Sequence, residues 1–169
     1  MFSVRSATVD DTYAVATVHV RSWQVGYRGL IPDEFLEQMR AEDRAERYRF
    51  AEVDASLPHT IVATEGDRIL GFATLGASRD VGSLGEGEIF ALYVDPDTWG
   101  KGVGRTLIAN ARTRLAEMSF STANLWVLHG NQRAIRFYGS DGWTCDGSSR
   151  DAVVWGVAVN EIHFHRSLP

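Results

Sequence analysis

The chain has few cysteines and prolines and no apolar run long enough to cross a membrane. Cys145 is the only cysteine among 169 residues, which excludes a disulfide within the chain and fits a reducing compartment. The most apolar late stretch, residues 152–159, has eight residues, whereas a membrane helix needs about 20. The first eight residues also lack the apolar core of a signal peptide. We therefore expect a cytoplasmic protein that does not bind a membrane.

An excess of basic residues is also missing. Lysine and arginine number 17 against 22 acidic residues, which gives a net charge of −5. Residues 40–49 carry four arginines but also three acids, a pattern typical of a solvated helix face. Nucleic-acid-binding domains usually present a basic face, so no nucleic-acid partner is expected.

What is present is the composition of a globular domain. Apolar residues make up 44% and charged residues 23%, and the length of 169 residues fits one domain over 1–169. Glycine is mildly enriched, with 16 glycines against 4 prolines. The positions of these glycines carry much of the functional argument.

The hydrophobic pattern predicts an α/β protein. Thr8 and Asp11 have the spacing of a capping box, and apolar residues at helical spacing follow as far as Gly26. Further helices are expected over 33–39, 42–53, 103–118 and 131–140. Strands are expected over 3–6, 59–65, 68–75, 88–94, 124–128, 143–145 and 162–165, with a loop over 76–87. This order predicts a mixed sheet with helices on its faces and local parallel pairing.

A glycine cluster opens the helix expected from residue 103. Gly100, Gly102 and Gly104 lie between an apolar strand and a helix, where backbone N–H groups can surround a phosphate. A Walker A loop would need lysine at Arg105 and glycine at Trp99, so a P-loop nucleotide hydrolase is disfavoured. The dinucleotide fingerprint fails from either starting glycine. The cluster therefore predicts a phosphate site of another kind.

A second group of residues follows downstream. Asn131 is a suitable N-cap, and Ala134, Phe137 and Tyr138 share one face of the expected helix. Core packing explains Ala134 and Phe137. Tyr138 is open to a further role, since a buried hydroxyl needs a partner.

Together these segments resemble a known family. Residues 92–96 followed by 99–104 resemble the acyl-CoA motif of the GNAT superfamily of N-acetyltransferases, and 131–143 resembles its next motif. The resemblance covers nearly the whole chain. It implies a single-domain, mostly antiparallel twisted sheet of six to seven strands with about four helices, whose central parallel strands splay to hold acyl-CoA. Trp99 departs from the family, which usually has Gln or Arg there; its backbone N–H could still serve the phosphate.

The resemblance implies transfer of an acetyl group from acetyl-CoA to an amine, with no metal. Tyr138 matches the tyrosine that protonates the leaving sulfur, and the N–H groups of Leu92 and Val94 would hold the acetyl carbonyl and pantetheine. The cofactor-binding residues implied are Leu92, Tyr93, Val94, Trp99, Gly100, Lys101, Gly102, Val103, Gly104, Arg105, Thr106 and Asn131. A non-catalytic acyl-CoA-binding or sensing module is the alternative.

The reaction also needs a base. A primary amine with a pKa of about 10.4 is almost fully protonated at pH 7 and then has no lone pair. Glu88 is the preferred base, acting through water, with Glu86 as its alternative; His129 competes for a catalytic or substrate-binding role. His163 and His165 share a strand face but lack further ligands at metal spacing.

The acceptor is expected to be an amine that binds near the end of the first helix. Trp23, Tyr27 and Arg28 are the candidate substrate-binding residues, and Arg28 could bind a carboxylate. A small-molecule acceptor is preferred, because the sequence shows no extended acidic or basic segment that would form a peptide groove. A peptide amine is the alternative acceptor. A homodimer is possible, and Cys145 is expected to be a buried small hydrophobe.

Overall fold

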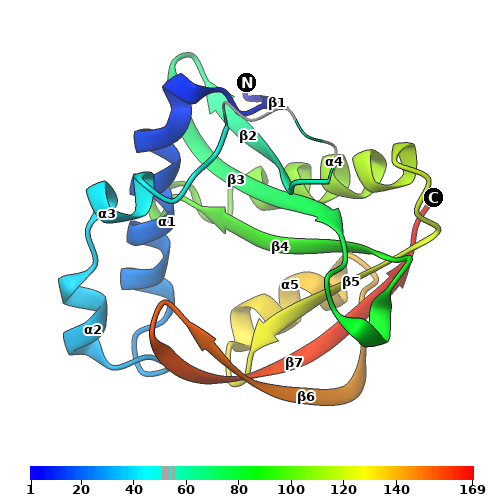
Figure 1. Cartoon of the computed structure of the whole chain (residues 1–169). Coiled ribbons are helices and arrows are strands. Elements are labelled where there is room, and N and C mark those ends of the chain that lie inside the picture. The colour runs from blue at the N-terminus through cyan, green and yellow to red at the C-terminus, as the bar shows by residue number, and fades with distance from the viewer. Residues whose placement is uncertain (51–53, 55) are drawn as a thin grey trace.

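A computed structural model of the chain describes residues 1–50, 54 and 56–169, and one seven-stranded sheet runs through it (Figure 1). The strand order is β1-β2-β3-β4-β5-β7-β6, and only the central β4–β5 pair is parallel. The strands are β1 Ser3–Ser6, β2 His59–Glu65, β3 Arg68–Ala77, β4 Gly87–Val94, β5 Thr122–Leu128, β6 Thr144–Val154 and β7 Val157–Ser167. The predicted mixed, mostly antiparallel sheet is confirmed.

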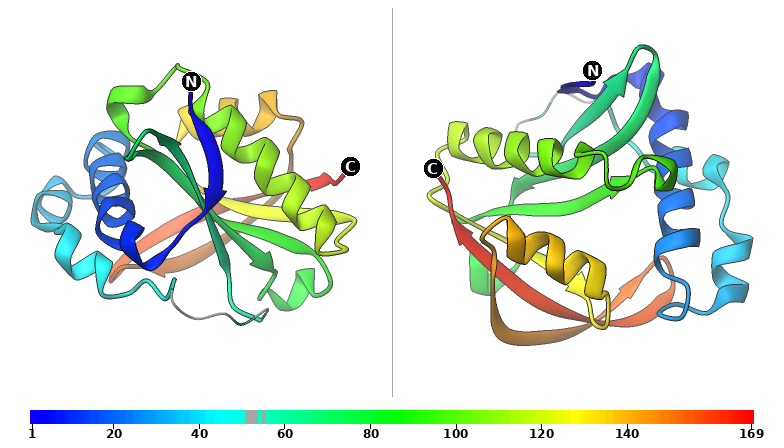
Figure 2. Two further views of the ribbon diagram at one scale, coloured as in Figure 1. Left: turned by 90° about the horizontal axis from the view of Figure 1, so that it is seen from above. Right: turned by 180° about the vertical axis from the view of Figure 1, so that it is seen from behind.

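The described residues form five α-helices, the number that the hydrophobic pattern predicts, whereas the resemblance implied about four. They are α1 Thr12–Gly26, α2 Asp33–Gln38, α3 Ala41–Ala45, α4 Val103–Glu117 and α5 Gln132–Ser140. Short 3₁₀ turns occupy Val9–Asp11, Val81–Ser83 and Pro96–Thr98. Figure 2 shows α1 and α4 on opposite faces of the first half of the sheet.

Successive side chains of a strand face opposite sides of the sheet, which explains why helices cover both faces. Ile61 and Ala63 of β2 pack into the core that α4 and α5 close, whereas Val62 between them packs with Val15 and Phe72 beneath α1. Successive side chains of a strand point to opposite faces, so an apolar run such as β2 has to be covered on both.

The central parallel pair separates almost at once. β4 and β5 pair only at Gly87 with Ala123 and Glu88 with Asn124, and then diverge (Figure 1). The fully buried Asn124 of β5 holds the two strands together where they pair. Its Nδ2 donates to the Gly87 carbonyl at 3.3 Å and to the Glu86 carboxylate at 3.2 Å. The splayed strands expected from the resemblance are therefore present, and the opening begins beside Glu88.

The capping box at the start of the first helical segment is confirmed. The Asp11 carboxylate accepts from the Thr8 N–H at 2.7 Å, and Arg5 donates to both its oxygens at 2.7 and 2.9 Å. These hydrogen bonds, above all that from Arg5, lower the pKa of the buried Asp11 to about 2.

Three local expectations were wrong. β6 and β7 form one long hairpin instead of strands over 143–145 and 162–165, because exposed polar residues of an edge strand show no apolar alternation. Cys145 is exposed on that edge, not buried. The helix expected over 42–53 ends at Ala45, and residues 51–53 of that range lie outside the described residues. No helix in the described part of the chain is long and apolar enough to cross a membrane.

Candidate active site

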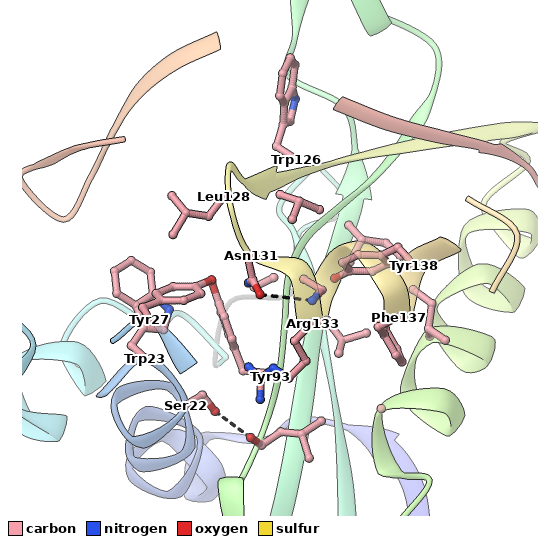
Figure 3. Close-up of a pocket in the computed structure, with 18 of the residues that line it drawn as sticks. Ser22, Trp23, Tyr27, Tyr93, Trp126, Leu128, Asn131, Arg133, Phe137 and Tyr138 are labelled. Carbon is pink, nitrogen blue, oxygen red and sulfur yellow. Dashed lines mark hydrogen bonds between the residues drawn. The ribbon is translucent and has the colours of Figure 1, made fainter. Parts of the chain in front are cut away.

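A cavity of about 640 Å³ lies where β4 and β5 separate (Figure 3). The end of α1, the start of α4, the inner face of α5 and the β6–β7 hairpin complete its walls. Most of the residues singled out from the sequence line it: Trp23, Tyr27, Glu88, Leu92, Tyr93, Val94, Trp99, Gly100, Gly102, Val103, Gly104, Arg105, Asn131 and Tyr138. Four lie outside the lining that the described residues form: Arg28, Lys101, Thr106 and His129.

The glycine loop has the backbone geometry of an anion cradle. Gly100 and Gly102 have φ of 77° and 88°, a left-handed conformation that other residues rarely adopt. Position 104 favours glycine for a different reason, since a Cβ on Gly104 would lie 3.3 Å from the Phe137 ring, which would have to move slightly. Each of the three glycines therefore has a physical cause.

The same loop leaves N–H groups free to bind an anion. The Thr106 N–H donates to the Gly102 carbonyl at 3.0 Å as the first intrahelical bond of α4. Helix geometry leaves the preceding N–H groups, those of Val103, Gly104 and Arg105, without an intrahelical acceptor. These donors and the positive end of the helix dipole suit the phosphates of a CoA molecule.

Trp99 is fixed in place by its own hydrogen bonds. Its indole Nε1 donates to the Val94 carbonyl at 2.8 Å, an oxygen that also accepts from the Ser22 hydroxyl at 2.8 Å. Its backbone N–H donates to Pro96 at 3.3 Å. The expectation that this N–H is available for phosphate is therefore not met.

Tyr138 enters the cavity from α5. The helix begins where the Asn131 side chain accepts from the Ala134 N–H at 3.2 Å. Tyr138 packs on Trp143 and Phe164, with its hydroxyl directed toward the cavity (Figure 3). Burial raises the pKa of the Tyr138 hydroxyl, which keeps it protonated across the physiological range.

Glu88 lies at the base of the opening, with only 6% of its surface exposed. Its Oε2 accepts from the Ser78 hydroxyl at 2.9 Å. Burial raises the pKa of the Glu88 carboxyl above its ordinary value, although the Ser78 hydrogen bond opposes the shift. Glu86 is half-buried and accepts from Asn124 outside the cavity lining of the described residues.

A network of charged side chains lies next to Glu88 and was not predicted from the sequence. Arg150 pairs with Asp80 at 2.9 Å and with Glu161 at 3.1 Å, and its guanidinium lies 4.0 Å over the Trp126 ring. The Trp126 indole in turn donates to Asp80 at 2.6 Å. Arg150 and Glu161 are directly opposite on β6 and β7, so recognising the long hairpin would have placed them together.

Aromatic rings form the wall on the α1 side. The Trp23 ring contacts Tyr27 at 4.8 Å, and the Tyr27 hydroxyl donates to that of Tyr93 at 3.4 Å. Trp155, at the tip of the β6–β7 hairpin, stacks on Trp23 from outside at 4.8 Å. No local signal in the sequence marks Trp155, because the contact depends on where the hairpin tip docks.

The other candidates lie outside the cavity lining that the described residues form. Arg28 pairs with Asp33 at 3.4 Å and Glu37 at 3.3 Å. His129 is exposed, and its backbone N–H donates to the Asn160 carbonyl at 2.8 Å. The His163 ring pairs with Asp146. The part of the chain that the structure describes holds no group of three or more His, Cys, Asp or Glu side chains that could bind a metal ion.

Comparison with known proteins agrees with this geometry. The profile of the Acetyltransferase (GNAT) family matches residues 20–143. The uncharacterized N-acetyltransferase YuaI of Bacillus subtilis (strain 168) is 31% identical over 139 residues, which is 82% of this chain and 78% of that protein.

Two solved structures share the fold. The PaiA N-acetyltransferase of Thermoplasma acidophilum, in complex with coenzyme A, superposes with a TM-score of 0.74 at 18% identity over 99% of both chains. YncA of Salmonella typhimurium, with its cofactor acetyl-CoA, gives 0.70 at 21% identity over 99% of this chain and 94% of that one. The chain belongs to the GNAT acetyltransferase family.

Proposed function

We propose that the protein transfers the acetyl group of acetyl-CoA directly to the primary amine of a small molecule within a ternary complex. The observation that carries this proposal is the placement of Glu88 and Tyr138 in one cavity, which ends in the glycine loop. One residue can take a proton from the amine, and the other can give one to the sulfur.

Glu88 is the proposed base. Its carboxylate accepts the ammonium proton of the acceptor, directly or through a water, which exposes the nitrogen lone pair. The burial that raises its pKa also makes it a stronger base than an exposed glutamate, while the Ser78 hydrogen bond orients Oε2.

Tyr138 is the proposed acid. Acetyl-CoA supplies a thioester whose C–S bond breaks as the C–N bond to the acceptor forms. The departing sulfur carries a negative charge, which the Tyr138 hydroxyl neutralises by donating its proton. Since burial keeps this hydroxyl protonated, it is ready to donate at neutral pH.

The remaining cavity residues would hold the acyl donor. The N–H groups of Val103, Gly104 and Arg105 at the start of α4 suit its diphosphate. The N–H groups of Leu92 and Val94, on the strand that diverges from β5, would hold the acetyl carbonyl and the pantetheine arm, beside Asn131.

The acceptor side favours a small molecule over a polypeptide. The hairpin tip is packed against α1 and α2, because Val154, Trp155 and Val157 join the cluster around Trp23. Among the described residues, this packing closes the gap between the hairpin tip and α1 through which an extended peptide could run. The pocket beside Glu88 is lined by Glu161 and Arg150, and Asp80 and Glu161 together compensate Arg150, which suits a cationic amine.

A thiol-release assay tests the proposal directly. The protein is incubated with acetyl-CoA and a panel of small amines, and free CoA is detected together with the acetylated products. We expect turnover with at least one small amine. CoA binding by calorimetry without turnover on any amine would support a non-catalytic acyl-CoA-binding module, and the absence of CoA binding would overturn both functions.

A further inference from the structure

Arg133 occupies an unusual position at the rim of the cavity. It lies in the first turn of α5, and its guanidinium stacks 3.4 Å from the centroid of the Trp99 ring. Trp99 directly precedes the glycine loop, and its hydrogen bond to the Val94 carbonyl holds the indole in place. The stack therefore brings a positive charge from α5 to the residue that precedes the glycine loop, and both residues line the cavity.

The end of α1 leaves room for this stack. A Cβ on Gly26 would lie 2.6 Å from Arg133 Nη2 and 3.7 Å from the Trp99 ring. Gly26 has an ordinary helical backbone, so its conformation does not require glycine. A Cβ at position 26 would therefore require the Arg133 guanidinium to shift from its place on Trp99.

The charge of Arg133 is left uncompensated. Arg150, in the same cavity, pairs with two carboxylates, whereas no carboxylate among the described residues pairs with Arg133. Partial burial lowers the pKa of Arg133, as expected for a cation that lacks an anionic neighbour. A cation held on an aromatic platform at the rim of the cavity, exposed and without a carboxylate partner among the described residues, is accessible to an anionic ligand.

We propose that Arg133, held flat on Trp99, places its guanidinium over the diphosphate of the acyl donor, opposite the N–H groups of the glycine loop. The inference rests on the proposed function. It explains how the site can bind a diphosphate although Trp99 has no charged side chain. The positive charge comes from Arg133 on α5, and Trp99 holds the guanidinium in position. The planar fork of arginine suits two phosphate oxygens at once.

Calorimetry with three ligands tests this assignment. CoA, 3′-dephospho-CoA and pantetheine are titrated into the wild type, Arg133→Ala and Arg136→Ala. Arg136 is the matched control, since it is exposed one turn further along the same helix and lies outside the cavity lining of the described residues. We expect Arg133→Ala to weaken CoA and 3′-dephospho-CoA about tenfold or more, and to leave pantetheine unchanged. Arg136→Ala should bind all three like the wild type.

Each other outcome has a distinct meaning. If Arg133→Ala binds CoA as tightly as the wild type, the assignment is overturned while the proposed function stands. A loss seen with CoA but not with 3′-dephospho-CoA would assign Arg133 to the 3′-phosphate instead. An equal loss for pantetheine would show a structural effect and also overturn it.

A second variant guards against misfolding. Arg133→Lys keeps the charge but loses the planar stack, so an intermediate affinity for CoA is expected, with an unchanged circular dichroism spectrum. A wild-type protein that fails to bind CoA would refute the proposed function itself, which separates the two failures.

Discussion

The indole of Trp155 stacks on that of Trp23, with ring centroids 4.8 Å apart and planes inclined by 17°. The Arg44 guanidinium lies 3.9 Å from the Trp155 ring. Trp155 also has a φ of 51°, a conformation that bulky residues seldom adopt, so its contacts must offset a local strain. Together with Val154 and Val157, this side chain packs the tip of the β6–β7 hairpin against α1.

Replacing Trp155 by alanine should therefore release the hairpin tip. We expect a loss of about 2 kcal/mol in the free energy of unfolding, less than for a fully buried tryptophan. The opened groove should admit peptide acceptors, so acetylation of a short peptide should rise relative to that of a small amine. Trp155→Phe, which keeps a stacked ring, is the control. Unchanged relative rates in Trp155→Ala would show that the hairpin does not select the acceptor.

Tyr138→Phe removes the proposed acid and little else, since the ring still packs on Trp143 and Phe164. Turnover should fall by about a hundredfold or more, with little change in affinity for acetyl-CoA. The comparison is Tyr13→Phe, because Tyr13 is exposed on α1 and its hydroxyl contacts only Glu42 among the described residues. A Tyr138→Phe enzyme with the wild-type rate would remove Tyr138 from the mechanism.

Glu88→Gln tests the base through the pH dependence of kcat/KM. A base must be deprotonated to act, so the wild-type rate should fall as the pH drops through the pKa of Glu88, which burial raises above the ordinary glutamate value. In Glu88→Gln this acidic limb should flatten and the rate near neutral pH should drop. Glu86→Gln should keep the limb. A limb that persists in Glu88→Gln would assign the base elsewhere.

Asp11→Asn tests how much the Thr8–Asp11 capping box stabilises the fold. The folded-state pKa of Asp11, about 2, lies below its unfolded value, so the carboxylate stabilises the fold above about pH 4. That contribution disappears as the pH falls toward 2. The variant should lose about 1–2 kcal/mol at pH 7 in urea denaturation, and the difference from the wild type should shrink in acid. Asp10→Asn, an exposed neighbour, should show little loss at either pH.

Features governed by neighbouring residues were predicted well. The Thr8–Asp11 box, the Asn131 cap and the turn at Gly100 and Gly102 follow from local rules of backbone geometry, and the structure contains each of them. The apolar strands were also found, because their pattern is read over a few residues. The β6–β7 hairpin was not, since an exposed edge strand needs no apolar alternation and its pairing is set at a distance.

The sequence indicated which residues could form the site, but not which of them line the cavity. The motifs indicated Tyr138, Glu88 and the glycines, but they also offered Arg28 and His129, which lie outside the cavity lining of the described residues. Whether a side chain reaches a cavity depends on the direction in which the backbone presents it. That direction is decided by strand register and helix packing.

The order of the elements, the caps and the turn at Gly100 and Gly102 were determined by the sequence, because each depends on the preferences of a few adjacent residues. The divergence of β4 from β5 and the docking of Trp155 on Trp23 were decided only in the folded chain. So was the raised pKa of Glu88, since desolvation depends on what packs around a carboxyl group and not on its neighbours in sequence. The same holds for the stack of Arg133 on Trp99, which joins two motifs that are separate in the chain.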